Sequence, residues 1–234
     1  MHRRRAAVRL ILYLLAATIV FPGPSTSHAT TAWTHFIHPV SDISRIAPNY
    51  YYDLNRVENQ MKDYTGWSCT NCTDVWGHTY DQHSGVDYPI GKHGAIYAAQ
   101  AGTVDEVVVD SVELCYFDSQ GKCTCNSTGN WQGTYVRIRH PLHYGDNKQY
   151  YTWYLHMIPT SLTVSKNDTV GKYSQLGTAN NTGYSCGDHL HWRVDEPLGT
   201  RVDPFDRSLV CGFLSDPYCS DDITPEGVIE GVPE

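Results

Sequence analysis

Short runs of β-branched and aromatic residues, separated by glycine, asparagine or aspartate, recur along the chain from Gly94 onward. Runs of this composition favour strands, and the breaks between them carry turn residues. In the run 135–140, Val136 and Ile138 are apolar and an arginine follows each, so one face is apolar and the other polar. No long amphipathic helical pattern accompanies the runs, which lie at 96–99, 103–109, 135–140, 150–156 and 189–194. The sequence therefore predicts a mainly β fold, an antiparallel sheet or sandwich with few short helices.

The first 29 residues have the pattern of an export signal: four arginines, an apolar run over 10–21, two prolines, and small residues at 27–29. We expect cleavage near Ala29. The alternative of a membrane anchor is disfavoured because the twelve-residue run is shorter than the roughly 20 residues that span a bilayer. Three adjacent arginines leave a twin-arginine export route open.

The chain is acidic, with 17 basic and 25 acidic residues and a formal net charge of -8. Removal of the signal takes away four arginines and no acid, which leaves 13 basic residues against 25 acidic ones and a charge of -12. Such a chain repels nucleic acid and anionic lipid. We therefore expect no nucleic-acid partner and no stable membrane insertion after the signal is removed.

A chain of 234 residues is long enough for one domain with attachments. After the signal at 1–29, residues 30–65 show no sustained period and are interpreted as a lead-in segment. Residues 66–210 hold the strand runs and are expected to form the domain. The segment 211–234 has no Lys or Arg and is rich in acids and proline, so we expect a partly disordered tail.

Eight cysteines lie beyond the signal, at positions 69, 72, 115, 123, 125, 186, 211 and 219. An even number in an exported chain favours disulfides. The alternative is a structural zinc knot that combines Cys69-x-x-Cys72 with Cys123-Thr124-Cys125, but the second spacing is tighter than in a usual zinc knuckle.

The pairing of the cysteines stays open at this point. Two links join cysteines that are close in the sequence: Cys211 with Cys219, and one within 115–125. The second of these falls in a polar insertion, 113–132, between two expected strands. We expect this insertion to be a long loop pinned by its cysteines.

Two pairs of residues have the spacing of metal ligands. His189 and His191 lie two apart in an expected strand, so they share a face with Leu190 behind them. His83 and Asp87 are four apart in "HSGVDYP", where Gly85 disfavours a helix, so they also share a face if the segment is extended. His83, Asp87 and His191 would give a three-ligand Zn²⁺ site with the fourth position open, which is typical of catalytic zinc. His156, at the end of another strand, could then face the same groove as His189.

Four elements, in this order along the chain, resemble the LytM/lysostaphin-type zinc endopeptidases, which cut bacterial cell-wall peptides. They are "HSGVDYP", "GAIYAAQAGTV", "YLHM", and the segment "NDTVGKYSQLGTANNTGYSCGDHLHWRV" with its closing turn and His-x-His strand. The resemblance spans about residues 76–205. It implies a single zinc ion held by His83, Asp87 and His191, with His156 and His189 as the catalytic pair.

The chain departs from the family pattern in a few places. The family usually has Thr and Pro where this chain has Cys186 and Asp188, and the insertion 113–132 is longer than usual. Lysostaphin-like members carry a tyrosine shortly before the first ligand that helps to bind the oxyanion. Tyr80 lies near that position, but its offset does not match cleanly. His140 resembles a structural histidine of the family and is left out of the site.

The resemblance and the export signal together predict a secreted or cell-wall-associated zinc metalloendopeptidase, active as a monomer on peptidoglycan peptides. It would hydrolyse a cross-bridge or stem peptide bond through a metal-activated water. Two alternatives stay open: a zinc-stabilised binding or regulatory module without turnover, and a secreted protease that acts on protein substrates.

Overall fold

The computed structural model describes residues 35–41, 53, 60–62, 68–71, 81–126 and 128–204. Several expectations fall outside these residues: the export signal 1–29, most of the lead-in 30–65, the tail 211–234, Tyr80, and the Cys211–Cys219 link. Among the described residues, no helix is long and apolar enough to cross a membrane.

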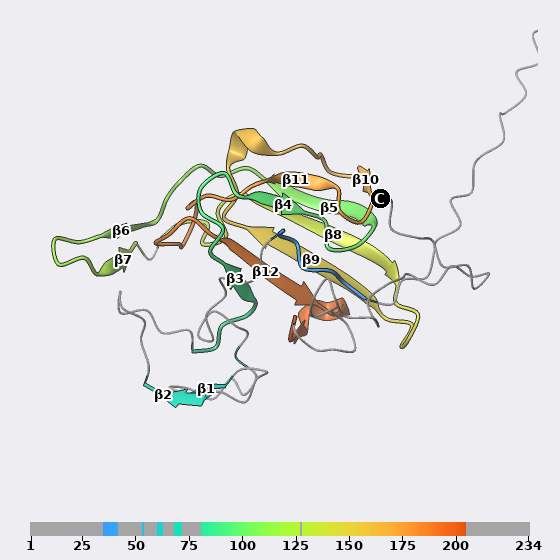
Figure 1. Ribbon diagram of the computed structural model, residues 1–234, viewed down its shortest axis with the longest axis horizontal. Helices are drawn as coiled ribbons and strands as arrows, with labels where there is room; N and C mark the ends of the chain where they lie inside the picture. Colours follow the sequence, from blue (N-terminus) through green and yellow to red (C-terminus); the bar gives the residue numbers. More distant parts are fainter. Residues whose placement is uncertain are drawn as a thin grey trace, which may run out of the picture.

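A seven-stranded antiparallel sheet forms the centre of the described part of the molecule (Figure 1). Its strand order is β10-β5-β8-β9-β12-β13, and β3 pairs with β12. These strands are β3 (Val86–Tyr88), β5 (Gly102–Val108), β8 (Tyr135–Leu142), β9 (Gln149–Leu155), β10 (Thr169–Val170), β12 (Leu190–Asp195) and β13 (Arg201–Val202).

Three two-stranded sheets accompany it: β1 (Gln60–Lys62) with β2 (Ser68–Thr70), β4 (Ala95–Tyr97) with β11 (Gln175–Thr178), and β6 (Cys115–Phe117) with β7 (Cys123–Cys125). The described helices are two short 3₁₀ turns, η2 (Pro159–Ser161) and η3 (Pro197–Gly199). The expectation of a mainly β, antiparallel fold with few short helices is confirmed.

One hydrophobic core joins the main sheet to the β4–β11 pair. Val136 and Ile138 of β8 are fully buried, whereas the arginines that follow them are not, as the alternation in the sequence predicts. Ile96 of β4 and Leu176 of β11 belong to the same buried cluster, together with Trp192 of β12. Because side chains of a strand alternate between faces, residues next to these core positions are turned to the other face of the sheet.

His140 is a buried polar member of the inward face of β8. Its Nδ1 donates a hydrogen bond to the Ala101 carbonyl at 2.9 Å, because a carbonyl can only accept. Its Nε2 lies 2.8 Å from the Thr152 hydroxyl, which can donate to it only if the imidazole is neutral. Burial lowers the pKa of His140 to about 4, although the Ala101 bond opposes that shift. His140 therefore holds β8 to β9 as a neutral ring, outside the site.

Because of His140, the free energy of unfolding should decrease as the pH is lowered. His140 takes up a proton near pH 6.5 in the unfolded chain but only near pH 4 when folded, so stability is lost as pH falls through this window. When the pH is lowered from 7 to 5, the free energy of unfolding measured in urea should fall by about 2 kcal/mol more in wild type than in His140→Asn. The asparagine keeps a donor for the Ala101 carbonyl. Equal losses in the two proteins would show that His140 does not titrate this way.

Candidate metal centre

The pairing of β3 with β12 brings two of the expected ligands together. In this antiparallel pair Asp87 lies directly opposite His191, and directly opposed residues of neighbouring strands project to the same face. Their side chains meet, with His191 Nδ1 2.8 Å from Asp87 Oδ1. Leu190, on the other face of β12, is fully buried in the core, as the alternation predicts.

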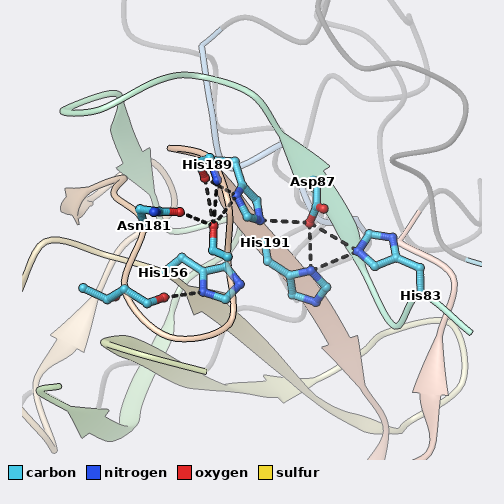
Figure 2. A network of polar contacts seen from close by, with 9 residues as sticks. His83, Asp87, His156, Asn181, His189 and His191 are labelled. Atoms are coloured by element: carbon cyan, nitrogen blue, oxygen red, sulfur yellow. Dashed lines mark hydrogen bonds and ion pairs between the residues drawn. The ribbon is translucent and has the colours of Figure 1, made fainter. Parts of the chain in front are cut away.

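His83 completes a triangle of donor atoms from the turn that precedes β3 (Figure 2). Its Nε2 lies 3.1 Å from His191 Nδ1 and 3.3 Å from Asp87 Oδ1. Ligands at about 2.0–2.2 Å from a tetrahedral ion stand about 3.3–3.6 Å apart, so the triangle, whose third edge is the 2.8 Å between His191 Nδ1 and Asp87 Oδ1, is slightly smaller than one tetrahedral face. The structure thus brings His83, Asp87 and His191 together as one group of three possible ligands.

The donor set fits a divalent cation. Three acceptor atoms at these distances repel one another unless a proton or a cation lies among them. Two imidazole nitrogens and one carboxylate oxygen are ligands of Zn²⁺. The His191 ring is also held tightly on one side, because a Cβ added at Gly85 would lie 2.7 Å from its Nε2. The glycine between the first two ligands is therefore required for the close approach of the third.

The protonation states suit metal binding at neutral pH. Burial lowers the pKa of His191 to about 4, against the opposing effect of Asp87, so the ring is neutral. Burial raises the pKa of Asp87, but the nearby imidazoles, His83 first among them, hold that pKa well below its usual range. His191 and Asp87 thus offer a neutral nitrogen and an ionised oxygen, the forms in which these residue types bind metals.

His156 follows the end of β9 and faces the site with one ring nitrogen fixed. Its Nδ1 donates to the Thr182 carbonyl at 2.7 Å, which leaves Nε2 with the lone pair of a neutral ring. Burial, then the charges of His189 and His191, lower the pKa of His156 well below its usual value. Its backbone has φ of 61°, a left-handed conformation that is uncommon for a residue with a side chain and occurs often at functional sites.

His189, like His156, is oriented by a hydrogen bond from its Nδ1 to a backbone carbonyl. Its Nδ1 donates to the Gly187 carbonyl at 2.7 Å, and its Nε2 lies 3.5 Å from Asp87 Oδ1. Burial lowers the pKa of His189, but the charge and hydrogen bond of Asp87, the Gly187 carbonyl and the charge of Asp188 together outweigh burial, so the pKa is raised overall. The rings of His156 and His189 are 4.8 Å apart (Figure 2). Two imidazoles therefore border the ligand triangle, and a backbone carbonyl sets the tautomer of each.

The residues that hold the histidine pair were missed by the sequence reasoning. Thr182 and Gly187 act through backbone carbonyls, and Ser185 contributes a hydroxyl 3.2 Å from His189 Nδ1. The segment "NNTGYSCGD" indicates only a turn, and nothing in its residue types shows which carbonyl will accept. Tertiary pairing was needed to find them.

Two disulfides pin the insertion between β5 and β8. Cys115–Cys125 closes the β6–β7 hairpin, which confirms the link expected within 115–125. Cys123–Cys186 joins the hairpin to the segment just before His189 and was not predicted. Both Cys123 and Cys125 are in disulfides in the structure, in place of the zinc knot considered with Cys69 and Cys72.

An antiparallel sheet that carries a His-Asp-His triangle, bordered by two histidines with fixed tautomers, has the arrangement of a metal-dependent hydrolase. The family model described as "Peptidase family M23" matches residues 81–204, more than half of the chain. The chain belongs to peptidase family M23. Membership supports metallopeptidase activity and dependence on a metal ion.

Individual proteins are similar to parts of the chain. An "Uncharacterized metalloprotease" of Haemophilus influenzae is 27% identical over 110 residues, 47% of this chain and 18% of that protein. A mutant catalytic domain of the prophage-encoded M23 protein EnpA from Enterococcus faecalis is 25% identical with a TM-score of 0.39, over 56% of this chain and 82% of that one. The catalytic domain of lysostaphin from Staphylococcus simulans is 21% identical with a TM-score of 0.38, over 53% of this chain and 77% of that one.

Substitution of Gly85, which is not itself a ligand, should weaken metal binding. In Gly85→Ala the new methyl group would meet the Trp192 backbone carbonyl first and His191 Nε2 at 2.7 Å, so this part of β12, and the His191 ring with it, must move away from the other two donors. We expect zinc affinity to fall about 10- to 100-fold in a chelator competition titration, as when the support of a ligand is lost. Gly171→Ala is the control, because its Cβ would meet only Ser174 Oγ at 3.6 Å. Equal zinc affinity in the two variants, with native circular dichroism, would contradict this packing argument.

Proposed function

We propose that this chain is an exported, monomeric zinc endopeptidase whose domain, 66–210, hydrolyses peptide bonds of bacterial peptidoglycan outside the cell. The observation that carries the proposal is the convergence of His83, Asp87 and His191 beside two further histidines. The peptidoglycan substrate rests on the four ordered motifs that resemble the LytM/lysostaphin-type enzymes, and the location on the export signal at 1–29.

His83, Asp87 and His191 would hold the ion through Nε2, Oδ1 and Nδ1, the atoms that face one another. A bound zinc ion supplies Lewis acidity and lowers the pKa of a coordinated water to about 7. Asp87 also lies beside His189 Nε2 within the same cluster, so it links the ligand triangle to the histidine pair.

His156 and His189 carry out the proton transfers. Because Nδ1 of each ring is bound to a backbone carbonyl, Nε2 is the atom left to accept a proton from the attacking water or to donate one to the departing amine. The same nitrogens, when protonated, stabilise the charge that develops on the carbonyl oxygen. Among the described residues every cysteine is in a disulfide, so none of them is available as a thiolate nucleophile.

Purified protein without its signal should release new amino termini from isolated cell walls. Treatment with a chelator should abolish the release, because the three ligands alone supply no Lewis acid, and added zinc should restore it. Mass analysis of the soluble fragments identifies the bond that is cut. Walls that stay intact after zinc is restored, while an unrelated protein substrate is cut, would replace the proposed substrate with a protein.

The histidine pair should be required for turnover and dispensable for metal binding. In His156→Ala and in His189→Ala we expect turnover to fall about 10²- to 10⁴-fold, the usual range for loss of general acid–base catalysis. Zinc content, measured by elemental analysis, should stay at one ion per chain in both. His143→Ala is the control, because His143 is also buried but bonds Asp146 away from the site. Variants that bind zinc and hydrolyse cell walls as fast as wild type would show that the pair is not catalytic, whereas zinc-loaded wild type and variants that are all without turnover would indicate a binding module.

A further inference from the structure

The carbonyl that orients His189 belongs to a loop without a strand, 184–188. Gly187 supplies this carbonyl, at 2.7 Å from His189 Nδ1. A Cβ added at Gly187 would meet no atom within 4 Å, so its outer side has no packing neighbour. Glycine also has the widest backbone freedom of any residue. The acceptor that directs His189 therefore needs support from the residues beside it.

Ser185 supports the loop from within. Its hydroxyl lies 2.7 Å from Asn181 Oδ1 and 2.8 Å from the Gly187 carbonyl. A hydroxyl has a single proton to donate, so it can satisfy only one of these two acceptors at a time. This contact therefore leaves the Gly187 carbonyl only partly restrained.

The second support comes from the β6–β7 hairpin, which holds the loop at two points. Before the loop, Gly183 pairs with the base of the hairpin: the Leu114 amide donates to the Gly183 carbonyl at 2.8 Å, and the Gly183 amide donates to Val112 at 2.7 Å. Within the loop, Cys186, next to Gly187, is bonded to Cys123 of β7. The hairpin thus holds the loop by backbone pairing before it and by a covalent bond at its centre.

We infer that the Cys123–Cys186 disulfide is a positioning element for catalysis, which keeps the Gly187 carbonyl, and through it His189 Nε2, directed at the metal site. This inference rests on the proposed function. The disulfide includes none of the three possible ligands and neither histidine of the pair, and acts through the loop. No proline fixes φ within 184–188, so the bond at Cys186 supplies the covalent restraint that the loop sequence lacks.

A second disulfide in the same hairpin provides a control for the removal of Cys123–Cys186. Cys115–Cys125 lies in the same β6–β7 pairing, and it closes the hairpin without reaching the loop. Removal of either disulfide costs the fold one cross-link within the same element. Of the two, only removal of Cys123–Cys186 takes away a covalent restraint on the loop beside His189.

The experiment compares Cys123→Ser/Cys186→Ser with Cys115→Ser/Cys125→Ser. Each double variant leaves no free thiol in the hairpin, so the remaining disulfide cannot rearrange. In the first we expect kcat to fall about 10- to 100-fold, the loss that a misplacement of about 1 Å produces, while KM and zinc content stay close to wild type. In the second we expect kcat close to wild type.

A spectroscopic measurement separates positioning from general stability. In zinc-loaded protein labelled with ¹⁵N at histidine, the Nδ1–H proton of His189 should exchange with water about tenfold faster in Cys123→Ser/Cys186→Ser, because its bond to Gly187 opens more often. The Nδ1–H proton of His156, bound to Thr182, should be unchanged and serves as the internal reference.

Wild-type kcat together with wild-type exchange at His189 in Cys123→Ser/Cys186→Ser would overturn the inference, and so would equal effects in the two double variants. Failure of the proposed function would give a different experimental result. If the wild-type protein does not hydrolyse cell walls, the exchange rates at His189 still show whether this disulfide holds the imidazole.

Discussion

The pairing of β3 with β12 is the constraint on which the site depends. Val86 and Tyr88 of β3 and Leu190 and Trp192 of β12 are all fully buried in one core. The residue between each pair is turned to the opposite face, where Asp87 stands directly opposite His191. A slip of β3 by one residue along β12 would turn Val86 and Tyr88 out of the core. Hydrophobic packing on one face therefore sets the register of the ligands on the other.

The second layer of the site consists of backbone carbonyls. His156 and His189 come from different strand ends, yet each gives its Nδ1 proton to a carbonyl of the segment 182–187. One short segment thus sets the tautomer of both rings. The strain at His156, with φ of 61°, costs about 1–3 kcal/mol and is maintained because its own carbonyl and amide are bonded to Asn180 and Gln132. The geometry of the histidine pair is therefore imposed by the surrounding backbone.

The inserted β6–β7 hairpin shows where local reasoning reaches its limit. Its closure by Cys115–Cys125 follows from the short sequence separation of 10 residues, because a short loop is the easiest to close. The bond between Cys123 and Cys186 spans 63 residues, and the cysteine spacing contains no signal for it. The link forms because Gly183 pairs with the hairpin base and brings the two segments together. It connects an element outside the main sheet to the neighbour of a site histidine.

The sequence by itself determined the fold class, because a period of two in β-branched runs is a local property that each segment carries alone. It also pointed to His83 with Asp87 and to His189 with His191, since even spacing within an extended segment places side chains on one face, and the resemblance to the LytM-type family selects His191 as the third ligand. Only the tertiary structure decided that these three donors face one another, and which carbonyls of Thr182 and Gly187 orient His156 and His189. Those distances depend on strand register and on loop closure across about a hundred residues, and register is fixed by the packing of the whole core.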